Sequence, residues 1–391
     1  MATDISRTLE ATIKTETDRT GKSILLLGPR QVGKSTLLAK LDPKLTINLA
    51  DESMFREHVK DPALIRRQVH ALPVKSKILI DEVQRLPSIL NTIQALIDEK
   101  KGWIFLITGS SARKLKRGQA NLLPGRVFEH RLFPLTYWEL GEQFNLEKVL
   151  STGSLPEIYL QDYGPELLRN YIDIYLREEI QAESLTRNIG SYSRFLDLAA
   201  AASGEIINYS ALASDSEIPK ETLRRFYTLL EETLLIHRLP AYTKIKGGRK
   251  ALQRERIVFF DLGVCNAILG AHKNVLTETL KGHLFEQWLA LQLIAYSSYH
   301  RLDWKFSHYR DDRGNEVDLI IDTGPRLLAL EIKYSTSIKP KYANGLREFA
   351  QYTKKPVKLI IVYRGDTPQR LDRVSAMPYR ELLDRIKVIA G

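Results

Sequence analysis

Residues 28–35 constrain this chain more than any other segment, because they read GPRQVGKS. The run matches G-x-x-x-x-G-K-S, the phosphate-binding P-loop. The two glycines allow a tight turn whose N–H groups point at phosphate oxygens, while the lysine and serine serve the phosphates and Mg²⁺. The apolar run at 23–27 predicts a buried parallel strand before the loop, and 36–41 predicts a helix after it. Strand, loop and helix in this order predict a nucleotide site in a parallel α/β sheet.

The loop supplies most of the residues that we expect to bind ATP. These are Gly28, Pro29, Arg30, Gln31, Val32, Gly33, Lys34, Ser35 and Thr36. Lys34 is also expected to act in catalysis by placing a cation on the β- and γ-phosphates, and Ser35 to bind Mg²⁺. The alternative, a glycine loop that only turns the chain, is disfavoured by the flanking strand and helix.

Two acids follow the apolar run at 77–80, namely Asp81 and Glu82. Asp81 is expected at the carboxyl end of a strand, where open α/β sheets bind ligands, and there it would contact the nucleotide's Mg²⁺. Glu82 is expected to polarise the water that attacks the γ-phosphate. The alternative is a pair of solvated acids that begin a loop.

A third apolar run at 103–111 ends in small polar residues. Thr108 or Ser110 is expected to contact the γ-phosphate or the attacking water, unless these residues only cap the next helix. Arg126 and Arg113 are candidates for stabilising transition-state charge, a role that a neighbouring subunit often fills. Either arginine alone is better explained as a surface residue. An arginine acting across chains would require a homo-oligomer.

The charge distribution along the 391 residues is uneven, and the net charge is +11. Residues 1–150 carry 24 basic and 17 acidic side chains (+7), residues 151–255 carry 13 and 15 (−2), and residues 256–391 carry 21 and 15 (+6). A basic surface favours nucleic acid as a partner, or serves solubility. No apolar run is long enough to span a bilayer, no signal pattern opens the sequence, and Cys265 is the single cysteine. We therefore expect a cytoplasmic protein without a membrane partner.

The middle of the chain, residues 151–250, is predicted to be mostly helical. Residues 194–240 read as a helix-turn-helix with a wing, whose third helix begins near Pro219. Such a helix can enter a DNA major groove, and Lys220, Arg224 and Arg225 would then contact the DNA. The net acidic charge of this segment favours the alternative, a structural lid on the nucleotide domain.

Residues 251–391 predict a third domain of alternating strands and helices. A strand at 316–321 carries Asp318, and a strand at 328–333 carries Glu331 and Lys333. Because side chains two apart share a face of a strand, Glu331 and Lys333 are expected on one side, with Asp318 converging from the next strand. Two such carboxylates can hold Mg²⁺, and the lysine can position a water or stabilise developing charge.

Four segments together resemble the AAA-type (ASCE) P-loop ATPases of bacteria and archaea: GPRQVGKSTLL, ILIDEVQRLP, LITGSSARKL and LPGRVFEHRLFPLTYWEL. Members of that family carry a C-terminal half that resembles restriction endonucleases of the PD-(D/E)XK type. The resemblance implies an ASCE-type parallel sheet, with ATP and Mg²⁺ as cofactors. It also implies that Glu286, on a helix at about 280–298, is a further acidic metal ligand beside Asp318 and Glu331.

The predicted α/β architecture is therefore a P-loop domain at 1–150, a helical and winged-helix segment at 151–250, and a nuclease-like domain at 251–391. Two functions stay open. The first is an ATPase coupled to a metal-dependent nuclease that engages DNA, with Lys333 in its catalytic site. The second is an ATP-driven switch whose C-terminal domain binds nucleic acid or a protein without cleaving it.

Overall fold

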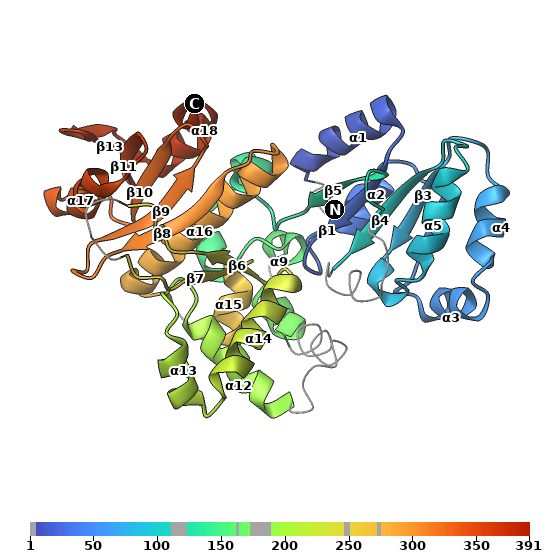
Figure 1. Ribbon diagram of the computed structural model, residues 1–391, viewed down its shortest axis with the longest axis horizontal. Helices are drawn as coiled ribbons and strands as arrows, with labels where there is room; N and C mark the ends of the chain where they lie inside the picture. The colour runs from blue at the N-terminus through green and yellow to red at the C-terminus, as the bar shows by residue number, and fades with distance from the viewer. Residues whose placement is uncertain (1–4, 111–122, 162–163, 173–188, 246–250, 272–274) are drawn as a thin grey trace. The chain divides into compact units, whose positions relative to one another are not determined.

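The computed structural model describes residues 5–110, 123–161, 164–172, 189–245, 251–271 and 275–391 (Figure 1). The chain divides into two compact units, which we describe separately. Unit 1 comprises Met1–Phe144, Ser154–Asp162 and Thr228–Leu235, and unit 2 comprises Asn145–Gly153, Tyr163–Tyr227 and Ile236–Gly391. Three domains with boundaries at 150 and 250 stay a prediction, because these units are defined by compactness alone.

Unit 1 is built on a five-stranded sheet in which every neighbouring pair of strands is parallel. Its strands are β1 (Ser23–Leu27), β2 (Leu45–Asn48), β3 (Lys77–Asp81), β4 (Ile104–Gly109) and β5 (Val127–Arg131). The spatial order is β2-β3-β4-β1-β5, so β4 separates the P-loop strand from the strand that ends in Asp81. The predicted N-terminal parallel sheet is confirmed.

Helices cover this sheet on both sides (Figure 1). The helices of unit 1 are α1 (Thr8–Thr20), α2 (Lys34–Ala39), α3 (Glu52–Lys60), α4 (Leu64–His70), α5 (Ile89–Asp98), α7 (Tyr137–Leu140) and α9 (Pro156–Leu160), with 3-10 turns η1 (Val83–Arg85) and η2 (Gly141–Gln143). Apolar residues of α4 and α5 pack on alternate strand residues such as Leu25, Ile80 and Ile107. Because β1, β3 and β4 are parallel, their carboxyl ends meet at one edge of the sheet.

Unit 2 contains a six-stranded mixed sheet in the order β12-β13-β11-β10-β9-β8. The strands are β8 (Lys305–Arg310), β9 (Glu316–Asp322), β10 (Leu327–Lys333), β11 (Val357–Tyr363), β12 (Gln369–Leu371) and β13 (Val374–Pro378). Strands β8, β9 and β10 form an antiparallel meander, whereas β10 pairs with β11 in parallel across α17 (Asn344–Tyr352). The long helix α16 (Glu278–Tyr299) precedes the meander, and α18 (Tyr379–Ala390) ends the chain.

The remaining elements of unit 2 include the segment predicted as a winged helix. They are α8 (Leu146–Thr152), α10 (Gly164–Asn170), α12 (Ile189–Ala201), α13 (Tyr209–Ser216), α14 (Lys220–Glu232, which ends in residues grouped with unit 1), β6 (Ile236–Leu239), β7 (Arg256–Phe259), α15 (Leu262–Ile268) and the turn η5 (Pro340–Ala343). Strands β6 and β7 pair antiparallel after the three helices, in the predicted order. The turn expected at residues 247–249 lies outside the described residues, and the winged-helix assignment stays a prediction.

Within the described part of the chain, no helix combines the length and the hydropathy that a bilayer crossing requires.

Candidate functional site

The P-loop of unit 1 wraps around the side chain of its own lysine. Lys34 begins α2 and is buried, and its Nζ donates to the carbonyl oxygens of Gly28 (2.9 Å) and Pro29 (2.8 Å). Gly33 has φ +92°, and a Cβ at Gly28 would lie 2.5 Å from the carbonyl oxygen of Leu132. Both glycines are therefore required, one by its backbone conformation and the other by a close approach. Pro29 and Val32 are also buried, whereas Arg30, Gln31 and Ser35 are partly buried and Thr36 is exposed.

Three elements meet at the carboxylate of Asp81. The Ser35 hydroxyl, from α2, donates to Asp81 Oδ1 over 2.6 Å, and the Thr108 hydroxyl, from β4, donates to the same oxygen over 2.5 Å. A hydroxyl and a carboxylate oxygen in contact at the carboxyl edge of a parallel sheet are hard ligands of the kind that Mg²⁺ prefers. The chemistry of these donors fits the predicted metal at the nucleotide site.

A second network follows directly along the chain at Glu82. This residue has φ +56° and ψ +46°, a left-handed conformation that is uncommon outside glycine, and its N–H donates to Thr108 Oγ1 (2.9 Å). The amide nitrogen of Gln84 donates to Glu82 Oε2 and to Ser110 Oγ (2.7 Å), and the N–H of Ser110 donates to Gln84 Oε1 (3.2 Å). Sequence reasoning gave Gln84 no role, although its place two residues after Glu82 was a usable signal.

Arg7 is a further residue that sequence reasoning missed. It precedes α1 and is 7% exposed. Its guanidinium donates to the carbonyl oxygens of Val32 in the P-loop (2.6 Å) and Phe133 (2.6 Å), and to the carboxylate of Glu139 (3.1 Å). No motif or periodicity marks this arginine in the sequence, because its partners lie far away along the chain.

The structure does not bring Arg126 to the phosphate-binding loop of its own chain. Its guanidinium binds both carboxylate oxygens of Asp98, at 2.8 and 3.0 Å. Strand β5 begins one residue later and runs parallel to β1, so Arg126 lies at the amino edge of the sheet and the P-loop at the carboxyl edge. The predicted role of Arg126 in stabilising transition-state charge, for which the sequence analysis named a neighbouring subunit as the common source, stays a prediction. Arg113 lies outside the described residues.

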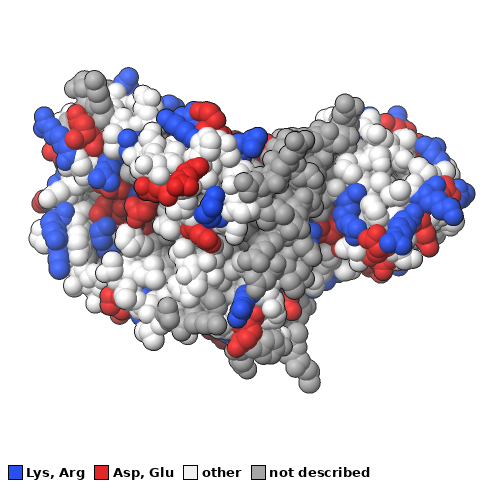
Figure 2. Space-filling model, turned by 90° about the horizontal axis from the view of Figure 1, so that it is seen from below, with Lys and Arg blue, Asp and Glu red and all other residues white. Residues whose placement is uncertain are grey.

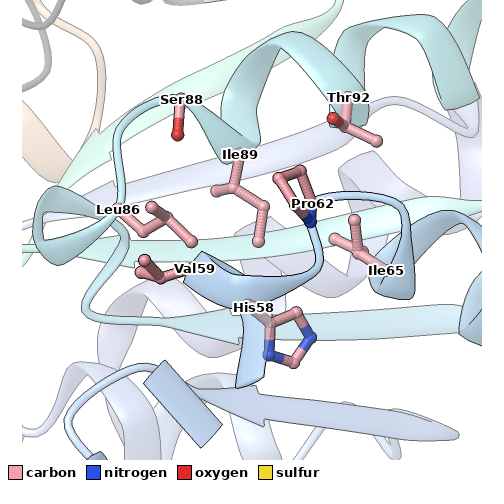
Figure 3. Close-up of a pocket in the computed structure, with 8 residues that line it drawn as sticks. All are labelled: His58, Val59, Pro62, Ile65, Leu86, Ser88, Ile89 and Thr92. Carbon is pink, nitrogen blue, oxygen red and sulfur yellow. The ribbon is translucent and has the colours of Figure 1, made fainter. Parts of the chain in front are cut away.

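A cavity of about 300 Å³ lies elsewhere in unit 1, between α3, α4 and α5 (Figure 3). Its walls are mostly apolar, as at Val59, Ile65 and Ile89, and the ring nitrogens of His58 contact Met54 O (2.8 Å) and Gln68 Oε1 (3.2 Å). A lining of this kind does not suit a triphosphate. The cavity is thus separate from the nucleotide site.

In unit 2 the structure brings together the acids and the lysine expected from the sequence. Leu319 of β9 pairs with Leu330 of β10, which sets Asp318 beside Glu331. Lys333 Nζ lies 2.7 Å from Glu331 Oε1 and 3.3 Å from Asp318 Oδ2. The N–H of Ile332 donates to the same Asp318 oxygen over 2.7 Å, which fixes that carboxylate against β10.

Burial dominates the electrostatics of this cluster. It raises the pKa of Glu331 to about 7, with a further contribution from the charge of Asp318. Burial and Asp318 also raise the pKa of Glu286 well above its ordinary value. Burial alone lowers the pKa of Lys333, but Asp318 and Glu331 outweigh it and the net pKa is raised. The single positive charge of Lys333 thus offsets part of the negative charge of the two strand carboxylates.

The metal site with three carboxylates that the sequence predicts stays a prediction. Over the residues that the structure describes, no three His, Cys, Asp or Glu side chains gather closely enough to hold a metal ion. Glu286 on α16 nevertheless lines a small cavity together with Asp318, and the charges of Asp318, Lys333 and Glu331 act on its pKa. The ammonium of Lys333 instead pairs with both strand carboxylates.

Comparison with protein families divides the chain into three matched segments. Residues 20–141 match the model of a family described as an AAA domain. Residues 143–274 and 281–382 match two models that are each described as a domain of unknown function (DUF8612 and DUF4143). The AAA match and the P-loop geometry support an AAA-type P-loop ATPase domain in unit 1. The restriction-endonuclease-like assignment of residues 251–391 gains no support from these matches.

The chain also resembles individual proteins along most of its length. An uncharacterized protein of Mycobacterium tuberculosis is 26% identical over 371 residues, which cover 92% of this chain and 80% of that protein. An uncharacterized protein of Methanocaldococcus jannaschii is 23% identical, over 69% of this chain and 66% of its own. A crystal structure of a Signal Transduction ATPase with Numerous Domains (STAND) protein from Pyrococcus horikoshii matches with 14% identity and a TM-score of 0.24. That match covers 77% of this chain and 49% of the solved chain, so the chain spans about half the length of that protein.

Proposed function

We propose that unit 1 binds ATP with Mg²⁺ and hydrolyses it. The observation that supports this most directly is the meeting of Ser35, Asp81 and Thr108 at one carboxylate oxygen, next to a P-loop lysine. Three sequence segments that are far apart supply these groups, and the sheet order places them at one edge. The match of residues 20–141 to an AAA domain supports the same function.

The roles of the residues follow from their positions. The backbone N–H groups of the loop would bind the phosphates, and Lys34 would exchange its two carbonyl contacts for phosphate oxygens. Ser35 and Asp81 would hold Mg²⁺, which when bound neutralises charge on the phosphates. Glu82 would accept the proton of the attacking water, and Ser110 at the end of β4 would contact the γ-phosphate.

Calorimetry with ATP and Mg²⁺ tests this proposal, with Lys34→Ala as the decisive variant. We expect the wild-type chain to bind ATP, and the variant to lose binding because the cation on the β- and γ-phosphates is gone. Lys40→Ala removes an exposed lysine at the other end of α2 and is the matched control. ATP binding or hydrolysis at the wild-type level in Lys34→Ala would remove the site assignment.

We further propose that unit 2 acts on nucleic acid through the cluster of Asp318, Glu331 and Lys333. The supporting observation is the contact of one lysine with carboxylates from two adjacent strands. The order α16, β8, β9, β10, α17, β11 also fits the expected restriction-endonuclease-like fold. Asp318 and Glu331 would hold Mg²⁺, which can lower the pKa of a bound water. Lys333 would stabilise the charge that develops on the phosphate.

Incubation of the full chain with plasmid DNA and Mg²⁺ or Mn²⁺ separates this proposal from binding without cleavage. If the cluster cuts DNA, we expect nicking that Lys333→Ala abolishes, while Lys339→Ala, which removes an exposed lysine nearby in the sequence, behaves as wild type. Salt-sensitive DNA binding without any nicking would support the switch that binds but does not cleave.

A further inference from the structure

Gln84 links two residues of the proposed ATPase site, and neither a motif nor a family match assigns it a role. Its side-chain nitrogen donates to the carboxylate of Glu82 and to the hydroxyl of Ser110 (2.7 Å), while its oxygen accepts from the Ser110 N–H (3.2 Å). We propose that Gln84 is a positioning residue that fixes the Glu82 carboxylate relative to Ser110. This inference rests on the function proposed for unit 1.

Within the described part of the chain, the hydrogen bond from Gln84 fixes the Glu82 side chain, whereas Thr108 fixes only its backbone. Its N–H is bound by Thr108, and its left-handed backbone begins the turn η1. The glutamate side chain has three rotatable bonds, and a general base works only within hydrogen-bond reach of its proton. The bond from Gln84 engages Oε2, so that Oε1 is the oxygen left to accept a proton from water.

Gln84 is itself fixed at both atoms of its amide. The residue is 5% exposed, and Ser110 contacts the amide oxygen through its N–H and the amide nitrogen through its hydroxyl. This double contact sets which amide atom faces Glu82, because only the nitrogen can donate to a carboxylate. Ser110 follows the last residue of β4. If Ser110 contacts the γ-phosphate, the side chain of Gln84 alone links that contact to the Glu82 carboxylate.

The variant Gln84→Met tests the role, because methionine has a similar length but neither donor nor acceptor of comparable strength. We expect kcat for ATP to fall about 10- to 100-fold through misplacement of the base, with nucleotide affinity and KM essentially unchanged. Gln94→Met, on the partly buried side of α5, is the control for a lost glutamine and should keep wild-type kcat. A purely structural role would change affinity or thermal stability along with kcat.

Ser110→Ala approaches the same network from its other end, and Gln84→Asn, which keeps the amide on a shorter side chain, replaces Gln84→Met if that variant does not fold. We expect Ser110→Ala to lower kcat as well. The double variant Gln84→Met/Ser110→Ala should have a kcat no lower than that of the less active single variant. A wild-type kcat in Gln84→Met would overturn the role of Gln84 without affecting the proposed ATPase function. So would losses of kcat that add fully in the double variant. A wild-type chain that does not hydrolyse ATP would instead refute the proposed function, and this inference with it.

Discussion

Glu82 is the proposed general base of the ATPase site, and a single substitution tests this role. The Glu82→Gln variant keeps the shape and the hydrogen-bonding length of the side chain but cannot accept a proton. We expect it to bind ATP as the wild type does and to lose turnover by about 10²- to 10⁴-fold, the usual contribution of general base catalysis. Parallel calorimetry and phosphate-release assays measure the two quantities.

Glu57→Gln, on the exposed side of α3, is the matched control for the loss of a charge. It should leave both binding and turnover unchanged. If Glu82→Gln retained turnover, the base would be another group, and the contact of Gln84 with Glu82 would be structural.

His308 in unit 2 predicts a pH dependence of stability. Burial and the nearby Arg256 and Arg310 lower its pKa to about 4. Its Nε2 contacts Arg254 O (3.0 Å), and its Nδ1 finds no hydrogen-bond partner among the described residues, so a second ring proton would lack an acceptor. An unfolded histidine titrates near pH 6.5, so between about pH 6.5 and 4 only the unfolded chain binds the proton.

The free energy of unfolding should therefore fall as the pH is lowered through that window, by up to about 3 kcal/mol. Denaturant unfolding between pH 7 and 4 measures this slope. His308→Gln should flatten it, whereas His283→Gln, at a half-exposed histidine of α16, should not. Equal slopes for the wild type and His308→Gln would show that another group causes the acid sensitivity.

At the scale of elements, the strands that consist of apolar runs and the P-loop were predicted from the sequence. The strand at 23–27 and the strand at 316–321 lie where apolar runs placed them, because burial on a sheet selects such runs. Strands β2 and β5 have mixed composition and partial burial, and no pattern identified them. The position of Arg126 was not predicted for a related reason, since the sequence does not show at which edge of the sheet a residue lies.

The candidate-site residues also fall into two groups, those that a sequence motif marks and those that only tertiary contacts reveal. Motif residues such as Lys34 and Asp81 lie where expected, because the P-loop and the end of an apolar strand fix their positions. Arg7 and Gln84 were not predicted, because their importance comes from tertiary contacts with residues on other elements. Lys333 was predicted beside two carboxylates, but its pairing with both of them was not.

The contacts of Arg7, which precedes α1, lead us to expect that the conformation of the P-loop depends on this N-terminal residue. Arg7→Met would leave the carbonyl oxygens of Val32 and Phe133 without their guanidinium donor, and would leave the buried Glu139 carboxylate without its ion-pair partner. We expect unit 1 to lose about 1–3 kcal/mol of stability, and nucleotide affinity to weaken because the loop is held less firmly.

Thermal unfolding with and without ATP measures both effects of Arg7→Met. Arg19→Met removes an exposed arginine from the last turn of α1 and should change neither quantity. Wild-type stability and nucleotide affinity in Arg7→Met would show that the hydrogen bond from Arg7 to Val32 O does not stabilise the P-loop.

At the scale of the whole molecule, charge bears on the proposed nucleic-acid partner. The excess of basic residues lies in the first 150 residues and in the last 136, whereas residues 151–255 are net acidic. On the face in Figure 2, acidic and basic side chains are mixed over both units, so this face is not a purely basic surface. Phosphate contacts would therefore come from local groups of lysine and arginine, whose number a salt titration can measure.

If the two units work together, nucleotide bound in unit 1 should change the affinity of the full chain for DNA. We expect fluorescence anisotropy with a labelled duplex to give a several-fold difference between the chain with and without a non-hydrolysable ATP analogue. Lys34→Ala should show no such difference, because it does not bind the analogue. In every case the logarithm of the binding constant should fall linearly with the logarithm of the salt concentration, with a slope near −0.9 per neutralised phosphate. Equal DNA affinity of the wild type with and without the analogue would mean that the ATPase site and the carboxylate cluster act independently.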